Sequence, residues 1–162
     1  MKNPDIKPNP AFAGVDIGKA LLDVSLAGQP PCRHPNDAAG IAALITALKK
    51  LPQPAQVICE PGGGYERDLL AALWAAGLAV SLMHAARVRA FARAQGRLAK
   101  TDPIDAVVLR EFGELLRPGT LAAPSPERER LAALVQRRGQ LVNLLSMEDQ
   151  HLARPETRWC RK

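Results

Sequence analysis

The sequence predicts an α/β domain built on a mixed β-sheet and followed by one long helix. Three observations predict it. Short apolar runs of strand length fill the first third of the chain, strand and helix patterns then alternate, and the last third carries a single long helical pattern. Three leading antiparallel strands followed by βαβ units specify a mixed sheet with helices on its faces. The expected order is βββαβαβα, followed by the long helix.

Turn and capping residues divide the chain into these elements. Gly18 and Lys19 separate two apolar runs and predict a hairpin. Asn36 and Asp37 offer a helix cap, and Gly77 ends the next helix. In chain order we expect a disordered leader at 1–10, strands at 11–17, 20–27 and 32–34, a helix after residue 37, a strand at 56–60, a helix at 65–76, a strand at 78–83, a helix that breaks at Gly96, and a helix opening at Thr101.

The carboxyl-terminal third should be organised differently. We expect the compact domain to cover 11–117, a linker to follow at 118–125, and a tail to occupy 153–162. The helix predicted at 126–152 has an apolar stripe, interrupted by Arg138 and Gly139, that either pairs with a partner helix or folds back on the domain. The stripe consists of Leu131, Leu134, Val135, Leu141, Val142 and Leu145.

The charge distribution is uneven. The chain has 22 Lys and Arg against 16 Asp and Glu, a net charge of +6, and the stretch from His84 to Lys100 contains no acid. A basic stretch beside an acidic metal site suits a phosphodiester substrate, whereas the alternative is a solvated helix face. The expected nucleic-acid contacts are Lys19, Arg87, Arg89, Arg93, Arg97 and Lys100.

Several protein classes are disfavoured. The three cysteines are far apart and form no CxxC pair, which argues against zinc ribbons and disulfide frameworks. No apolar run reaches membrane-spanning length, and the first ten residues lack the apolar core of a signal peptide. We therefore expect a cytoplasmic protein that does not bind membranes.

Four acids in three separate segments are the candidate metal ligands and catalytic residues. Asp16 and Glu60 each end an apolar run, so both should point from the sheet into one crevice. Asp102 and Asp105 are three residues apart at a helix start and share a face. Carboxylates gathered in this way need cations, and Mg²⁺ suits an all-oxygen site, with Mn²⁺ as a substitute. Such a site supports two-metal phosphodiester cleavage.

Each acid also has a structural explanation. Asp16 could be a turn residue at the hairpin, and Asp102 and Asp105 could complement a helix dipole. Glu60 is harder to explain in this way, because a carboxylate that closes an apolar strand needs a partner. Taken together in this element order, the four acids favour a metal site.

Three motifs in this order resemble one protein family. The segments DIGK, ICEPGGGY and KTDPIDA resemble the amino-terminal domain of the DEDD insertion-sequence transposases, also called RNA-bridged recombinases. That domain is similar in fold to the Holliday-junction resolvase RuvC and to ribonuclease H. The resemblance implies that Asp16, Glu60, Asp102 and Asp105 are the four Mg²⁺ ligands for DNA strand cleavage.

The resemblance implies partners as well. They are DNA, a structured guide RNA, and a second copy of the chain that pairs through a coiled coil at 126–152. In the family a second domain supplies a serine nucleophile, and we expect that domain to lie outside this sequence. One departure is the Pro61–Gly62 pair, because a small hydroxyl residue is expected before the glycine.

Two other functions compete with a DNA-cleaving transposase domain. One is a non-catalytic nucleic-acid binding and dimerisation module that keeps the acids without turnover. The other is a sugar kinase or actin-like protein, which also opens with an Asp-x-Gly hairpin. The length of 162 residues disfavours the latter, because that fold needs two lobes.

Overall fold

The computed structural model describes residues 10–53, 55–97 and 102–152 and divides the chain into two compact units between Ala123 and Pro124. The elements are β1 (Ala11–Ile17), β2 (Leu21–Leu26), β3 (Cys32–Pro35), α1 (Ala38–Lys49), β4 (Ala55–Cys59), α2 (Arg67–Ala75), β5 (Ala79–Leu82), α3 (Ala85–Ala94), α4 (Asp102–Leu116) and α5 (Pro126–Leu152).

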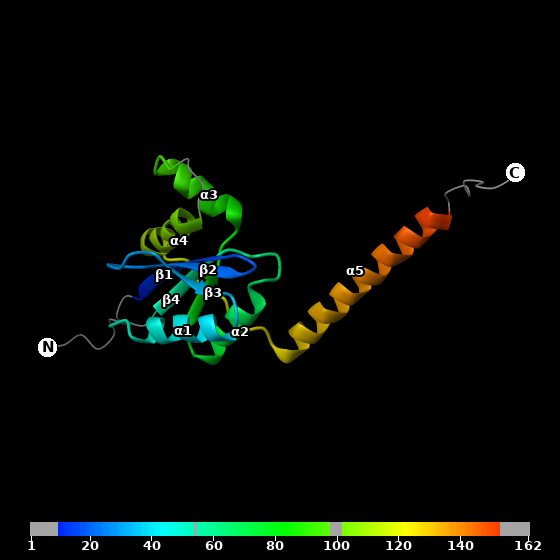
Figure 1. Cartoon of the computed structure of the whole chain (residues 1–162), viewed down its shortest axis with the longest axis horizontal. Coiled ribbons are helices and arrows are strands. Elements are labelled where there is room, and N and C mark those ends of the chain that lie inside the picture. Colours follow the sequence, from blue (N-terminus) through cyan, green and yellow to red (C-terminus); the bar gives the residue numbers. More distant parts are fainter. Residues whose placement is uncertain (1–9, 54, 98–101, 153–162) are drawn as a thin grey trace, which may run out of the picture. The chain divides into compact units, whose positions relative to one another are not determined.

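The first unit contains a five-stranded mixed sheet with the strand order β3-β2-β1-β4-β5. β1 pairs antiparallel with β2, and β2 pairs antiparallel with β3. β1 also pairs in parallel with β4, and β4 with β5. In Figure 1, α1 and α2 lie on one side of this sheet and α3 and α4 on the other. The mixed α/β sheet expected from the sequence is confirmed.

The element boundaries differ slightly from the expected ones for local reasons. α2 begins at Arg67 rather than at residue 65, because the preceding residues form a turn held by the Glu66 carboxylate. The expected break at Gly96 is present, since α3 ends just before this residue, which has a left-handed φ of 76°, and α4 follows as a separate helix. Asp37 caps α1 as expected, since its Oδ1 accepts the Gly40 N–H at 2.8 Å. The expected cap at Thr101 lies outside the described residues.

The face of the sheet covered by α1 and α2 is built from hydrocarbon side chains. Alternate residues of the strands point to this face, and α1 and α2 bury their apolar stripes against them. Leu44 and Leu73, one from each helix, are fully buried. The strand residues of this cluster include Ala13, Val15, Ile17, Leu22, Val24, Leu26, Ala55, Val57, Cys59 and Val80.

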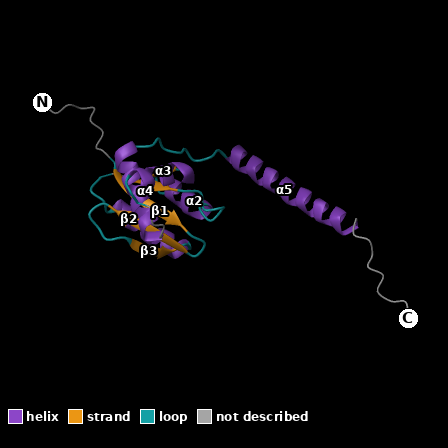
Figure 2. Cartoon of the chain, turned by 90° about the horizontal axis from the view of Figure 1, so that it is seen from above, coloured by secondary structure: helices purple, strands orange, loops and turns teal. Residues whose placement is uncertain are grey.

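The opposite face carries α3 and α4. A smaller cluster forms here, with the Phe91 and Phe112 rings in edge-to-face contact at 5.3 Å between centroids. α4 approaches β1 closely because Gly14 has no side chain. A Cβ at Gly14 would overlap the carbonyl oxygen of Ala106 and lie 2.5 Å from the backbone nitrogen of Arg110. The helix backbone therefore packs directly on the strand, and in Figure 2, seen from above, α4 overlies β1.

The segment after α4 is hydrogen-bonded to the sheet. The Leu121 N–H donates to the carbonyl of Val80, a residue of β5, at 2.6 Å. The Gln56 amide and the Ser81 hydroxyl donate to the carbonyls of Pro118 and Gly119, both at 2.8 Å. The first compact unit accordingly extends to Ala123.

The second unit contains the single helix α5. Ser125 precedes the helix, and its Oγ accepts the Arg128 N–H at 3.4 Å. Every side chain described between 126 and 152 is exposed, including Leu134 and Leu141 of the apolar stripe. Among the described residues, no helix combines the length and apolarity needed to cross a membrane.

Candidate functional site

Asp16 is the penultimate residue of β1, and Glu60 directly follows β4, the parallel neighbour of β1. Val15 of β1 pairs with Cys59 of β4, so the residues that follow them, Asp16 and Glu60, lie at the same edge of the sheet. Side chains alternate along a strand, which puts Asp16 on the same face as Gly14, under α4. Both acids are partly exposed. The sheet alone therefore brings these two carboxylates to one edge of one face.

The direction of α4 carries its first acids to the same edge. A Cβ at Gly113, late in α4, would meet the Phe12 ring at 2.7 Å, whereas Ala106, early in the helix, lies over Gly14. α4 thus runs antiparallel to β1, and its amino-terminal turn points toward the carboxyl end of that strand. Asp105 is in this turn and is partly buried. Asp102 is the first residue of α4, but its side chain lies outside the described atoms.

The chemistry of the donors fits a hard divalent cation. Carboxylate oxygens are the ligands that Mg²⁺ prefers, and the acids of this edge supply only oxygens. Among the described side chains no group of three His, Cys, Asp or Glu is close enough to hold a metal ion, and the Asp102 side chain is not among them. The fit therefore rests on the donor type and on the shared edge of Asp16, Glu60 and the start of α4.

Two loops behind this edge are fastened to each other. The Asn36 amide Nδ2 donates to the Gly18 carbonyl at 2.8 Å and to the Tyr65 carbonyl at 3.2 Å. It therefore bridges the turn after β1 and the loop after β4. Gly62 in the latter loop sits against the end of β1, since a Cβ there would lie 3.1 Å from the Ile17 carbonyl oxygen. These contacts limit the relative movement of the strand ends that carry the two acids.

The Glu66 carboxylate organises the same glycine-rich loop. Its Oε2 accepts the N–H groups of Gly62 at 2.9 Å and of Gly64 at 2.8 Å. Burial alone would raise the pKa of Glu66, but hydrogen bonds from the N–H groups of Glu66, Gly64 and Gly62, with the nearby Arg67 charge, lower it below its ordinary value. Glu66 thus remains ionised and stabilises the path of the chain after Glu60.

Cys59 is not a candidate nucleophile. Burial, followed by the negative charges of Glu66 and Glu60, raises the pKa of its thiol to about 12. The thiol is fully buried and stays protonated at neutral pH. Cys59 is a packing residue of the sheet, and in the described residues both it and Cys32 are free thiols.

The basic residues expected to contact nucleic acid have different surroundings. Arg87 stacks over the Phe112 ring at 5.7 Å, and Arg97 pairs with Glu111 at 3.0 Å. Arg93 on α3 and Lys19 in the turn after β1 are exposed, Arg89 is partly exposed, and Lys100 lies outside the described residues.

Sequence reasoning missed an ion pair on the face that carries Asp16. Asp23 of β2 lies directly opposite Asp16, and Arg33 of β3 lies directly opposite Asp23. The Arg33 Nη2 is 2.8 Å from the Asp23 Oδ1. The alternation within β2 would have placed Asp23 on this face, but the partner could be found only once the register of both strand pairs was known.

Comparisons with known proteins agree with this architecture. A sequence profile of transposases, the DEDD family of the IS110 type, matches residues 13–154. None of the curated proteins matches the chain. Among solved structures, the chain is similar to T. thermophilus RuvC in complex with Holliday junction substrate, with a TM-score of 0.50, 13% identity, and coverage of 70% of this chain and 100% of that one. At this identity the likeness shows the fold alone, which is RuvC-like. Because the family profile spans most of the sequence, the chain belongs to the DEDD transposase family of the IS110 type.

Proposed function

We propose that the first unit is the DNA-cleaving domain of a transposase, in which Asp16, Glu60, Asp102 and Asp105 hold two divalent metal ions. Mg²⁺ is the proposed ion, and Mn²⁺ substitutes for it. The observation that carries the proposal is the antiparallel path of α4 along β1. It directs the first turn of α4 to the edge where Asp16 and Glu60 end their strands.

The residues of the chain have distinct roles in this proposal. The bound ions would supply the activation of a water or hydroxyl nucleophile and the stabilisation of the leaving oxygen. The four carboxylates would orient the ions and leave coordination positions open for the scissile phosphate. Asn36 and Glu66 hold the two loops behind the acids and so reduce the reorganisation that binding requires.

Exposed basic residues of the first unit support a DNA substrate. Lys19 and Arg93 are exposed and carry charge that attracts a phosphate backbone. Arg97 and Arg87 also contact Glu111 and Phe112, which orient their guanidinium groups, so a phosphate would be bound by the donors that these contacts leave. Arg89 and Lys100 complete the proposed set of DNA contacts.

The test combines metal binding and DNA nicking in the same variants. Asp105→Asn should lower the affinity for Mn²⁺ measured by calorimetry, because it removes a proposed carboxylate ligand. Nicking of supercoiled DNA should fall by roughly 100-fold or more, which at 1.36 kcal/mol per factor of ten corresponds to about 2.7 kcal/mol of lost transition-state stabilisation. Asp68→Asn is the matched control, since Asp68 is an exposed acid in the first turn of another helix, α2. Equal nicking by the two variants would contradict the proposed site.

We also propose that α5 pairs with a helix of a second copy. Its exposed leucines and valines would be buried in such a pair. Burial of apolar surface stabilises association by roughly 25 cal/mol per Å², from which the loss of translational and rotational freedom must be subtracted. Light scattering of the chain and of a Leu134→Lys variant tests this. A wild-type monomer at high concentration would rule the pairing out. A dimer that binds DNA without metal-dependent cleavage would instead select the non-catalytic binding module.

A further inference from the structure

A row of charged residues crosses the sheet beside the proposed metal site. The register aligns Asp16 on β1 with Asp23 on β2, and Asp23 with Arg33 on β3. Residues directly opposite each other on neighbouring strands point to the same face, so all three side chains lie on the α4 side. The row runs from the candidate metal ligand to a cation two strands away.

The ion pair at the end of this row is asymmetric. The Asp23 side chain is 10% exposed, whereas that of Arg33 is 49% exposed. The Arg33 Nε and Nη2 lie 3.0 Å and 2.8 Å from the same oxygen, Asp23 Oδ1. A guanidinium has five N–H donors, and two of them satisfy this geometry. The buried carboxylate therefore holds the arginine in one orientation while part of its donor set faces solvent.

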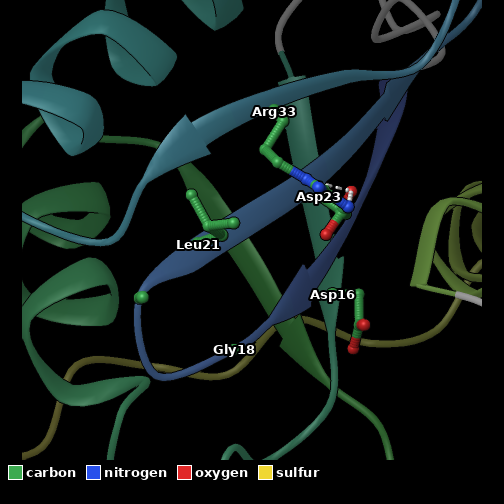
Figure 3. Close-up of a pocket in the computed structure, with 6 residues that line it drawn as sticks. Asp16, Gly18, Leu21, Asp23 and Arg33 are labelled. Carbon is green, nitrogen blue, oxygen red and sulfur yellow. Dashed lines mark hydrogen bonds and ion pairs between the residues drawn. The ribbon is translucent and has the colours of Figure 1, made fainter.

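The space between the ion pair and Asp16 is an open pocket. It has a volume of about 280 Å³ and is lined by Asp16, Gly18, Ala20, Leu21, Asp23 and Arg33. Figure 3 shows Arg33 reaching from its strand to Asp23, with Asp16 farther along the same surface. A water molecule occupies about 30 Å³ of liquid, so the pocket has room for a phosphate group and several waters.

We propose that Arg33 binds a backbone phosphate of the cleaved DNA strand, close to the scissile phosphate. Asp23 is a positioning residue for Arg33. This inference rests on the proposed function, because the carboxylates at Asp16 define where the scissile phosphate would lie. Neighbouring strands are about 4.8 Å apart, so Arg33 lies roughly 10 Å from Asp16 across the sheet. A DNA strand with one phosphate at the acids carries further phosphates within this distance.

The chemistry of the pocket selects a phosphate rather than another ligand. Arginine presents a planar fork that matches phosphate oxygens, and a fork already oriented by a carboxylate loses less conformational entropy on binding. Leu21, 40% exposed in the wall of the pocket, offers an apolar surface to a deoxyribose. Asp23 is neutralised by Arg33, so the pair presents no net negative charge to a phosphate.

The test measures DNA affinity as a function of salt, without catalysis. Fluorescence anisotropy of a short labelled DNA duplex is recorded over a range of NaCl concentrations, in EDTA and again in Ca²⁺. The key variant is Arg33→Ala combined with Asp23→Ala, which leaves no unpaired buried acid and keeps the net charge of +6. Lys49→Ala is the matched control, because Lys49 is an exposed cation at the end of α1, on the other face. Circular dichroism verifies that each variant is folded.

The double variant should bind DNA roughly tenfold more weakly at low salt, as expected for the loss of one charge-assisted contact. The slope of log affinity against log salt should fall in magnitude by about 0.9, the value for one phosphate on duplex DNA. Lys49→Ala should leave the slope unchanged. Binding of Mn²⁺ by the double variant should equal that of the wild type.

Several outcomes would overturn the inference. A slope equal to that of the wild type would mean that the ion pair is only structural. Loss of Mn²⁺ binding would make Asp23 a ligand rather than a positioning residue. An effect on an RNA duplex of the same sequence, without one on DNA, would assign the pocket to RNA. Failure of the proposed cleavage function would give a different result. Metal-dependent nicking would then be absent, while the salt slope of DNA binding would still differ between the wild type and the double variant.

Discussion

The two faces of the sheet differ in what they contribute. The face under α1 and α2 is hydrocarbon throughout its centre, with Leu44 and Leu73 fully buried. The face under α4 replaces hydrocarbon with a glycine at residue 14 and with the acids Asp16 and Asp23. The first face supplies most of the apolar burial, and the second gives up part of that burial to bring a helix start and charged groups together. Stability and the candidate chemistry are therefore separated by the thickness of one sheet.

The largest effect is expected from Gly14→Ala. The added methyl group would overlap the Ala106 carbonyl oxygen, and backbone atoms of a packed helix cannot move aside as a side chain can. We expect a loss of about 4 kcal/mol or more in the free energy of unfolding, at the upper end for overpacking, together with loss of Mn²⁺ binding. Urea denaturation and calorimetry measure the two quantities.

Gly113→Ala provides the control for that substitution. Its methyl group would meet only side chains, those of Ile58 and Phe12, each at 2.7 Å, and alanine is about 1 kcal/mol better than glycine inside a helix. The net change should be much smaller than for Gly14→Ala. Equal destabilisation by the two variants would show that the close approach of α4 to β1 at Gly14 has no special importance.

An intermediate effect is expected from Leu44→Ala on the opposite face. Removal of a fully buried leucine should cost about 3 kcal/mol, from lost transfer free energy and the cavity that remains. Mn²⁺ affinity, measured well below the unfolding temperature, should stay at the wild-type value, because α1 packs on the other side of the sheet. A parallel loss of metal binding would contradict the separation of the two faces.

The smallest effect is expected from Glu66→Gln, in the segment between β4 and α2. The folded pKa of Glu66 is lowered, so its ionised form stabilises the fold above the unfolded pKa of about 4.3. That contribution is lost as the pH falls through the lower folded pKa. The difference in unfolding free energy between wild type and variant should therefore be present at pH 7 and shrink under acid conditions. A difference independent of pH would assign the role of Glu66 to shape rather than charge.

The strands and most helices were predictable because their signals are local. Gly18 and Gly77 punctuate the chain, and Asp37 marks a helix start by capping chemistry alone. The start of α2 was misplaced by two residues because the Glu66 carboxylate binds the Gly62 and Gly64 N–H groups and so extends the turn that precedes the helix.

The site was predictable in part. Strand ends indicated a common edge for Asp16 and Glu60, since parallel neighbours carry their carboxyl ends to the same side. The Asp23–Arg33 pair was not predictable, because it depends on two strand registers at once. The ion pair between Arg97 and Glu111 was not predictable either, because it depends on how the segment after α3 packs against α4.

The docking of α4 on β1 also determines when a working site could exist during synthesis. Arg110 of α4 reaches Ser25 of β2 at 3.1 Å, across 85 residues of intervening chain. Closing so long a loop is slow compared with forming the local hairpin, and α4 is the last element of the first unit to leave the ribosome. The earlier strands can pair while the acids of α4 are still missing. A nascent chain would thus acquire the acids of α4, and with them the complete set of carboxylates in the proposed site, only when the last element of the unit has been made.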